Sequence, residues 1–123
     1  MIDDVEAFHK ASGQLILGDD QRPGLTRRVL RHRLLREEMN ELEDALIGSD
    51  IVEVADAYAD IIYIVLGSAL MHIGKERFLR VWSEVHRTNM AKCPNGKIAT
   101  QEDGKIIKPD GWTPPDIAGI LTP

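Results

Sequence analysis

Two glutamates interrupt a helix face that is otherwise apolar. Steps of four, three and four, the spacing of residues on one side of an α-helix, join Leu34, Glu38, Glu41 and Ala45. Glu38 and Glu41 therefore point where core residues are expected. The alternative is that both acids face the solvent and that the core stripe, which also has helical spacing, consists of Leu35, Met39, Leu42 and Leu46.

A second acidic face follows a short turn at Gly48-Ser49-Asp50. Glu53, Asp56 and Asp60 recur at steps of three and four in a segment that is otherwise strongly apolar. Antiparallel packing of the two helices, which so short a turn requires, brings four or five carboxylates into one small volume. Like charges in a partly dry site cannot all stay ionised unless cations join them, and carboxylate oxygens suit Mg²⁺ or Mn²⁺. The stretch predicts a site for more than one divalent metal ion.

Four helices are expected to position these side chains. Helical periodicity and glycine terminators predict helices over residues 3–12, 26–47, 50–73 and 75–90. Glycine and proline residues predict a loop over 13–24, with Leu15, Ile16 and Leu17 tucked beneath it. After residue 93 turn signals dominate, and residues 98–100 and 105–108 are predicted to pair as a small hairpin. The sequence therefore predicts an all-α fold with a mostly irregular C-terminal tail.

Length and composition narrow the class of protein. A chain of 123 residues suits a single domain over 1–123, with a helical core over about 1–92 and a tail over about 93–123. The formal net charge of −5 argues against non-specific nucleic-acid binding, which needs a basic surface. The single cysteine, Cys93, excludes an internal disulfide and suits a reducing compartment.

The same sequence gives an expectation for localisation. Its first residues are acidic, unlike a secretory signal peptide. Its longest mainly apolar run, Ile61–Met71, is too short to span a bilayer. We therefore expect a cytoplasmic protein with no membrane and no nucleic acid among its partners.

Polar residues near the end of the fourth predicted helix are candidates for substrate binding. Asn89 continues the apolar face of Phe78, Trp82 and Val85, so it lies where a core residue is expected. Lys92 follows where the chain leaves the helix, in a position to meet a phosphate. The alternative is that Asn89 and Lys92 merely cap the helix.

Arginines are concentrated just before the acidic pair. A cluster of guanidinium groups one turn from an acidic metal site is what a polyphosphate needs, although a solvated basic face is the alternative. The cluster consists of Arg27, Arg28, Arg31, Arg33 and Arg36.

The acidic motifs also carry a family resemblance. Glu38-x-x-Glu41, followed by Glu53-x-x-Asp56 at the start of an apolar helix, resembles the signature of the all-α nucleoside triphosphate pyrophosphatases, the MazG-like and phosphoribosyl-ATP pyrophosphohydrolase-like group. The pair Glu37-Glu38 matches the family's double glutamate. Residues 84–92 resemble the segment after the fourth helix of a MazG-like subgroup, and residues 103–116 resemble its C-terminal tail, so the resemblance covers most of the chain. The gap between the two motifs is at the short end for the family.

This resemblance implies an activity and a set of site residues. The implied reaction is hydrolysis of a nucleoside triphosphate, such as the deoxynucleotides dGTP or dUTP, at the α-phosphorus to a monophosphate and pyrophosphate. Whichever of Glu37 and Glu38 is free of metal is the expected general base. Two or three Mg²⁺ ions, with Mn²⁺ as a substitute, are expected on Glu38, Glu41, Glu53 and Asp56. The expected substrate contacts are Arg36, Asn89, Lys92 and Trp112.

Two other functions stay open. One is a phosphoribosyl-ATP-type pyrophosphohydrolase, although the tail of this chain looks less like that branch. The other is a non-catalytic helical module for oligomerisation or metal binding, which would show no nucleotide turnover when Mg²⁺ is added.

The third predicted helix indicates an assembly. It is apolar on more than one face, and one chain of this length has too few other elements to cover it. The residues in question are Ile61, Ile62, Ile64, Val65, Leu66 and Leu70. We therefore expect a four-helix MazG-like bundle completed by oligomerisation, as a homodimer or homotetramer, with Trp112 and the proline-rich tail at a pocket or an interface.

Overall fold

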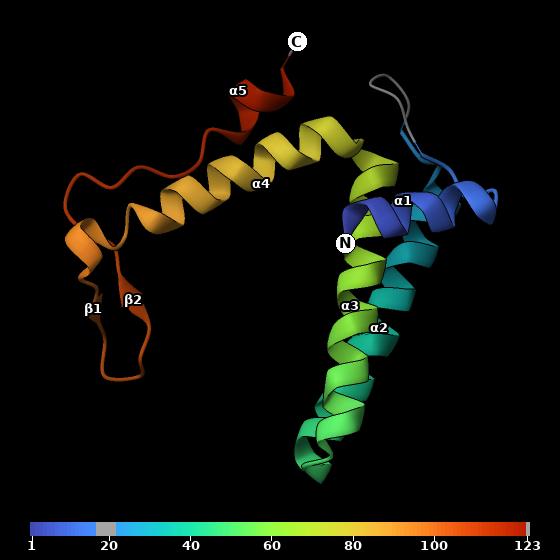
Figure 1. Cartoon of the computed structure of the whole chain (residues 1–123), viewed down its shortest axis with the longest axis horizontal. Coiled ribbons are helices and arrows are strands. Elements are labelled where there is room, and N and C mark those ends of the chain that lie inside the picture. Colours follow the sequence, from blue (N-terminus) through green and yellow to red (C-terminus); the bar gives the residue numbers. More distant parts are fainter. Residues whose placement is uncertain (17–21, 123) are drawn as a thin grey trace. The chain divides into compact units, whose positions relative to one another are not determined.

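The protein is mainly helical. The computed structural model describes residues 1–16 and 22–122, so the part of the predicted loop that contains Leu17 and Gly18-Asp19-Asp20 lies outside the described residues. The helices are α1 (Ile2–Ala11), α2 (Leu25–Gly48), α3 (Ile51–His72), α4 (Lys75–Met90) and α5 (Ile117–Leu121). A 3₁₀ turn, η1 (Pro94–Gly96), precedes two short strands, β1 (Ala99–Thr100) and β2 (Ile106–Ile107). The all-α prediction is confirmed (Figure 1).

The chain divides into two compact units, Met1–Lys75 and Glu76–Pro123. The first contains α1, α2 and α3, and the second contains most of α4 together with the whole tail. The boundary between the two units therefore falls after the first residue of α4. The single-domain organisation expected from the sequence stays a prediction.

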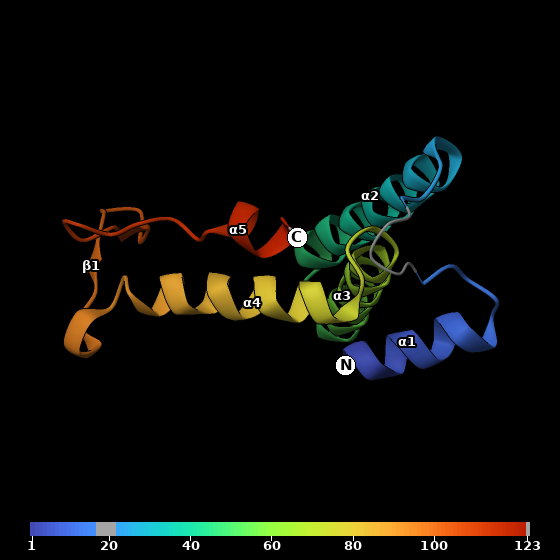
Figure 2. The ribbon, with the colours of Figure 1, turned by 90° about the horizontal axis from the view of Figure 1, so that it is seen from above.

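A tight turn makes α2 and α3 an antiparallel hairpin. Ser49 adopts a left-handed conformation (φ 56°), and the backbone N–H of Asp50 donates to the carbonyl oxygen of Ala45 at 3.2 Å. The Asp50 carboxylate then caps α3 by accepting from the backbone N–H groups of Val52 (3.0 Å) and Glu53 (3.4 Å). The two helices consequently run side by side, as Figures 1 and 2 both show.

Small residues let the hairpin helices approach closely. Ala45 on α2 and Ala57 on α3 are buried, and Leu42 joins them in the core. At the other end α1 packs on α3, where Val5 and Leu70 are almost completely buried. The core of this unit is therefore narrow and follows the seam of the hairpin.

A polar clamp sets the register of the hairpin. The Arg31 guanidinium donates from Nε to the Ser68 hydroxyl oxygen at 3.0 Å and from Nη2 to the Ile64 carbonyl oxygen at 2.6 Å. Gly67 makes room for it, because a Cβ atom there would lie 2.5 Å from Arg31 Nη2 and 2.6 Å from Nε2 of the buried His9. The clamp therefore joins α1, α2 and α3 at one level.

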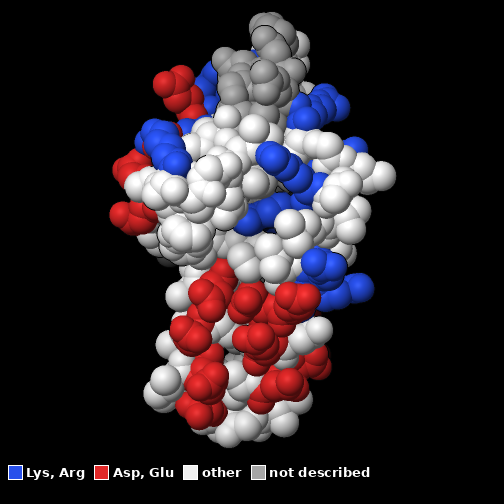
Figure 3. All heavy atoms as spheres, turned by 90° about the vertical axis from the view of Figure 1, so that its right-hand side faces the viewer, with Lys and Arg blue, Asp and Glu red and all other residues white. Residues whose placement is uncertain are grey.

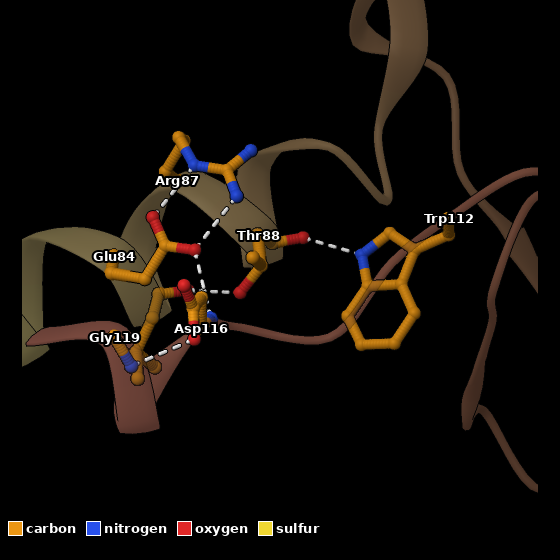
Figure 4. A network of polar contacts seen from close by, with 7 residues as sticks. Glu84, Arg87, Thr88, Trp112, Asp116 and Gly119 are labelled. Atoms are coloured by element: carbon orange, nitrogen blue, oxygen red, sulfur yellow. Dashed lines mark hydrogen bonds and ion pairs between the residues drawn. The ribbon is translucent and has the colours of Figure 1, made fainter.

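The second unit folds the tail back along α4. The hairpin pairs Ala99 with Ile107 and Thr100 with Ile106 in antiparallel register, which confirms the predicted strand pairing. The following segment returns alongside α4, where the Trp112 indole N–H donates to the Thr88 carbonyl oxygen at 2.7 Å (Figure 4).

A carboxylate on α4 holds the end of this returning segment. Glu84 accepts from the backbone N–H of Asp116 at 3.1 Å and from the Arg87 guanidinium at 2.8 Å (Figure 4). Arg87 first, and then the Asp116 N–H, lower the pKa of Glu84 to about 2. Asp116 also accepts from the N–H of Gly119 at 2.9 Å and so caps α5, a short helix that the sequence reading did not predict.

Among the residues that the structure describes, one helix is long and apolar enough to cross a membrane by length and composition alone. It is α3, whose mean hydropathy reaches 1.5 over its most apolar part. The core helix of a soluble protein meets the same criterion, so this property is weak evidence for a membrane location.

Candidate functional site

The register of the hairpin brings the two acidic faces together. Glu38 lies seven residues after Arg31 on α2. Seven residues before Ile64 and Ser68 on α3 lie Ala57 and Ile61, and Asp60 is in the turn between them. In Figure 3 the Asp and Glu side chains accordingly gather over one part of this unit, next to a group of Lys and Arg side chains. The predicted meeting of the two acidic helices is therefore present in the structure.

Glu38 is the electrostatic centre of this acidic cluster. Burial raises its pKa, and the charges of Glu41, Asp60, Asp56 and Glu37 raise it further, in that order. Its Oε2 atom is buried and has no hydrogen-bond partner within the part of the chain that the structure describes. A buried carboxylate oxygen without a partner is costly, so Glu38 is poised to take up either a proton or a cation.

The buried residues of α2 come from both of the alternative core stripes that the sequence allows. Leu42 from one stripe and Ala45 from the other are both buried, while Met39 and Leu46 are 49% and 53% exposed. Glu38 is half-buried and Glu41 is exposed. The pair therefore lies at the rim of the core rather than on a fully buried face.

Asp60 is the acid that the predicted ligand set left out. It acts on Glu38 more strongly than Asp56 does, whereas Glu53 is not among the charges that raise the pKa of Glu38. Glu53 lies in the first turn of α3, next to the hairpin turn, where Asp50 caps its backbone N–H. The signal for Asp60 was its spacing from Asp56, combined with a register that only the hairpin defines.

The carboxylate oxygens of the acidic cluster are chemically suited to bind a divalent metal ion. Over residues 1–16 and 22–122, no three His, Cys, Asp or Glu side chains converge closely enough to hold a metal ion. The donors are nevertheless hard carboxylate oxygens, they raise the pKa of Glu38 together, and one buried oxygen is unpartnered. A cation would relieve both the repulsion and the missing contact. The predicted ligands Glu38, Glu41, Glu53 and Asp56 stay a prediction.

The two candidate bases have different surroundings. Glu37 is 56% exposed, and its carboxylate lies 3.9 Å from Nε of the exposed Arg33. Glu38 is instead half-buried, and its Oε2 atom is buried. The assignment of the general base to one of them stays a prediction.

Arg36 lies on another side of α2. It lines a groove of about 640 Å³ together with His32, Leu35, Met39 and Asn40, and Glu38 is not a lining residue. The structure therefore does not place Arg36 beside the acidic cluster, and its predicted contact with substrate stays untested.

The other predicted substrate residues meet each other in the second unit. The Lys92 ammonium donates to the Asn89 side-chain oxygen at 2.8 Å and lies 5.2 Å from the centre of the Trp112 ring. Lys108, which the sequence reading did not select, lies 4.7 Å from the same ring. Asn89, Lys92, Lys108 and Trp112 thus form one cationic and aromatic group. Trp82 on α4, the helix that carries Asn89, is 63% exposed.

Comparison with known families agrees with this geometry. A family model described as phosphoribosyl-ATP pyrophosphohydrolase matches residues 5–89, which is more than half of the chain and includes both acidic helices. The chain belongs to the phosphoribosyl-ATP pyrophosphohydrolase family. Search of the curated proteins finds no match. Membership confirms the resemblance to the MazG-like all-α pyrophosphatases and makes the protein a pyrophosphohydrolase that acts on nucleotide phosphates.

Proposed function

We propose that this pyrophosphohydrolase cleaves a nucleoside triphosphate, with a deoxynucleotide such as dGTP or dUTP as substrate, in a Mg²⁺-dependent reaction. The observation that carries the proposal is the Glu38 carboxylate, whose pKa is raised by burial and by four neighbouring acids and whose buried oxygen lacks a partner. Membership of a pyrophosphohydrolase family supports the same chemistry.

The reaction requires a positioned water and a proton acceptor. The water oxygen forms a bond to the α-phosphorus, the bond from that phosphorus to the bridging oxygen breaks, and pyrophosphate leaves. The proton of the water passes to whichever of Glu37 and Glu38 is free of metal. When bound, Mg²⁺ neutralises phosphate charge and activates the water. The residues that would hold it are Glu38, Glu41, Glu53 and Asp56, joined by Asp60.

Phosphoribosyl-ATP is the second candidate substrate, because the matching family is described by that activity. The same bond is broken, since this nucleotide also carries a triphosphate. The acidic cluster alone therefore does not distinguish the two substrates. The match ends at residue 89, so the group of Asn89, Lys92 and Trp112 lies at or beyond its end.

A substrate panel tests both candidates. The full-length chain is incubated with each canonical NTP and dNTP and with phosphoribosyl-ATP, with Mg²⁺ or with a chelator, and products are followed by phosphorus NMR. We expect a monophosphate and pyrophosphate as primary products, and only with Mg²⁺. Orthophosphate as the first product would contradict cleavage at the α-phosphorus. Absence of turnover with every nucleotide would favour a non-catalytic module.

A further inference from the structure

A cavity separate from the groove that Arg36 lines is found nearer the start of α2 than the acidic cluster. It has a volume of about 270 Å³ and is enclosed by the segment after α1, one face of α2 and the end of α3. Its polar lining consists of Arg27, Arg31 and Gln14, and its apolar walls include Leu15, Leu30, Leu34 and Met71. A cavity of this size is smaller than the roughly 300–1,000 Å³ of whole-ligand sites and suits one part of a ligand.

Arg31 gives this cavity a fixed and partly buried positive charge. Its guanidinium is pinned by the Ser68 hydroxyl and the Ile64 carbonyl, both neutral acceptors. Burial lowers its pKa, which indicates that the charge is incompletely solvated. The nearby His9 is buried too, and Arg31 helps to lower the pKa of this imidazole. The guanidinium is therefore held rigidly at the cavity wall, and its hydrogen bonds within residues 1–16 and 22–122 go to neutral acceptors.

Arg27 adds a second charge one helical turn earlier. Residues four apart lie on the same helix face, and both arginines line the cavity from α2, Arg31 partly buried and Arg27 exposed. Within the described residues, no carboxylate forms an ion pair with either arginine. Arg33, in contrast, faces the Glu37 carboxylate. Among the described residues Arg31 meets only neutral acceptors, and an anion in this partly apolar cavity would supply a counter-charge.

We propose that the cavity bounded by Arg27, Arg31 and Gln14 is an oxyanion-binding subsite that takes a phosphate group. Guanidinium groups bind phosphate oxygens with two parallel hydrogen bonds, and Gln14 contributes an amide donor. Arg31 and Glu38 are seven residues apart on α2, which is about 10 Å along the helix. The phosphate therefore belongs either to the same nucleotide that the acidic cluster would hold, a reading that rests on the proposed function, or to free phosphate or pyrophosphate.

Binding of inorganic pyrophosphate to the full chain tests the subsite without any turnover. Titration calorimetry is performed in a chelator, so that no metal bridges the ligand to the acids. Arg27→Gln should weaken binding about tenfold, the loss expected for one charged hydrogen-bonding partner. Arg28→Gln is the matched control, because it removes the same charge from the next residue, which does not line the cavity. Arg31→Gln is expected to weaken binding as well, and melting curves show whether its fold persists.

Kinetics then identify the source of the phosphate. A raised KM with unchanged kcat in Arg27→Gln supports a substrate phosphate, whereas an unchanged KM with lost pyrophosphate binding supports a free ligand. Equal weakening by Arg27→Gln and Arg28→Gln, or no pyrophosphate binding by the parent chain, would overturn the subsite. If Arg27→Gln alters the preference for the base but leaves pyrophosphate binding intact, the proposed phosphate subsite is overturned in favour of a nucleobase pocket. Failure of the proposed hydrolysis is seen separately, as absent turnover with pyrophosphate binding intact.

Discussion

Glu38 shows how one carboxylate acquires unusual properties from its surroundings. Its side chain is half-buried at the rim of the hairpin core, and acids from both helices act on it. Each of these effects disfavours the ionised form, so the folded chain carries an electrostatic strain at this point. A bound cation or proton removes the strain, which is the property expected of a metal or proton-transfer site.

Removal of one charged acid beside Glu38 should abolish turnover without unfolding the chain. We expect Glu41→Gln and Asp56→Asn each to lower turnover by about a hundredfold or more, since each removes a proposed metal ligand. In a chelator both variants should melt at or above the parent temperature, because carboxylate repulsion is reduced. Turnover assays and thermal melts provide the measurement. Glu43→Gln, which changes a residue in the groove on another side of α2, is the control.

The outcome that contradicts this assignment is specific. Variants that melt well below the parent in chelator and still hydrolyse nucleotide would show that Glu41 and Asp56 support the fold rather than the chemistry.

His9 should make the fold sensitive to mild acid. It is 2% exposed, and burial lowers its pKa, with Arg31 acting in the same direction and the Leu15 backbone opposing. A histidine whose folded pKa lies below its unfolded value stabilises the fold above the ordinary histidine range. That stability is lost as pH falls through this range, because the unfolded chain takes up the proton first.

Melting temperatures between about pH 7.5 and pH 5.5 measure this effect. We expect the parent to lose stability toward the acid end and His9→Gln to show a flatter dependence, even if it is less stable throughout. His32→Gln, which changes an exposed histidine on α2, should keep the parent slope. Parallel curves for His9→Gln and the parent would refute the prediction.

The α2–α3 hairpin is the element that turns separate acidic motifs into one cluster. Its register is set at one end by the turn at Ser49-Asp50 and at the other by the Arg31 clamp. A slip by one residue would rotate each side chain by about 100° around its helix and separate the acids. The clamp is therefore as important for the site as the acids themselves.

Gly67→Ala tests the clamp. The added methyl group would collide with the Arg31 and His9 side chains, so we expect destabilisation by about 1–3 kcal/mol, although alanine favours helices. Chemical denaturation measures the change. Gly48→Ala is the matched control, because nothing lies near its added Cβ and helix propensity should make it neutral or stabilising. If both variants gain stability, Gly67 does not close the clamp.

The surface of the first unit is incompletely covered by its own chain. On α3, Tyr58, Ile62 and Val65 are between 41% and 50% exposed, and α2 carries the groove with Met39 and Leu46 exposed. Exposed apolar surface of this extent on two neighbouring helices is unusual for a monomer in water. We propose that a second copy of the chain covers it, as a homodimer or homotetramer.

Light scattering at micromolar concentration, in the absence of detergent, measures the assembly. We expect a mass of two or four times the chain mass of 13.8 kDa. A single active species with the chain mass would disprove the proposal that a second copy covers the apolar surface. If the chain is recovered only together with lipid vesicles, a membrane location of α3 would be favoured instead.

Local patterns in the sequence determined most of the helical architecture. The expected helices agree with α1 to α4 within about two residues, because periodicity, glycine terminators and the Asp50 cap act over a few neighbouring residues. The small strand pair was predictable for the same reason. The pairing of two acidic helix faces also followed from the sequence, since a short turn leaves antiparallel packing as the only solution.

Only the tertiary structure decided which side chains meet across elements. Asp60 acts on Glu38, Arg31 is clamped between Ile64 and Ser68, and Arg36 lines another groove, although spacing along the chain did not distinguish these outcomes. The exact register of the hairpin decides each contact, and register depends on long-range partners such as Gly67 and His9. Sequence periodicity reports the face of a helix, whereas the depth and neighbours of a side chain depend on what packs against that face.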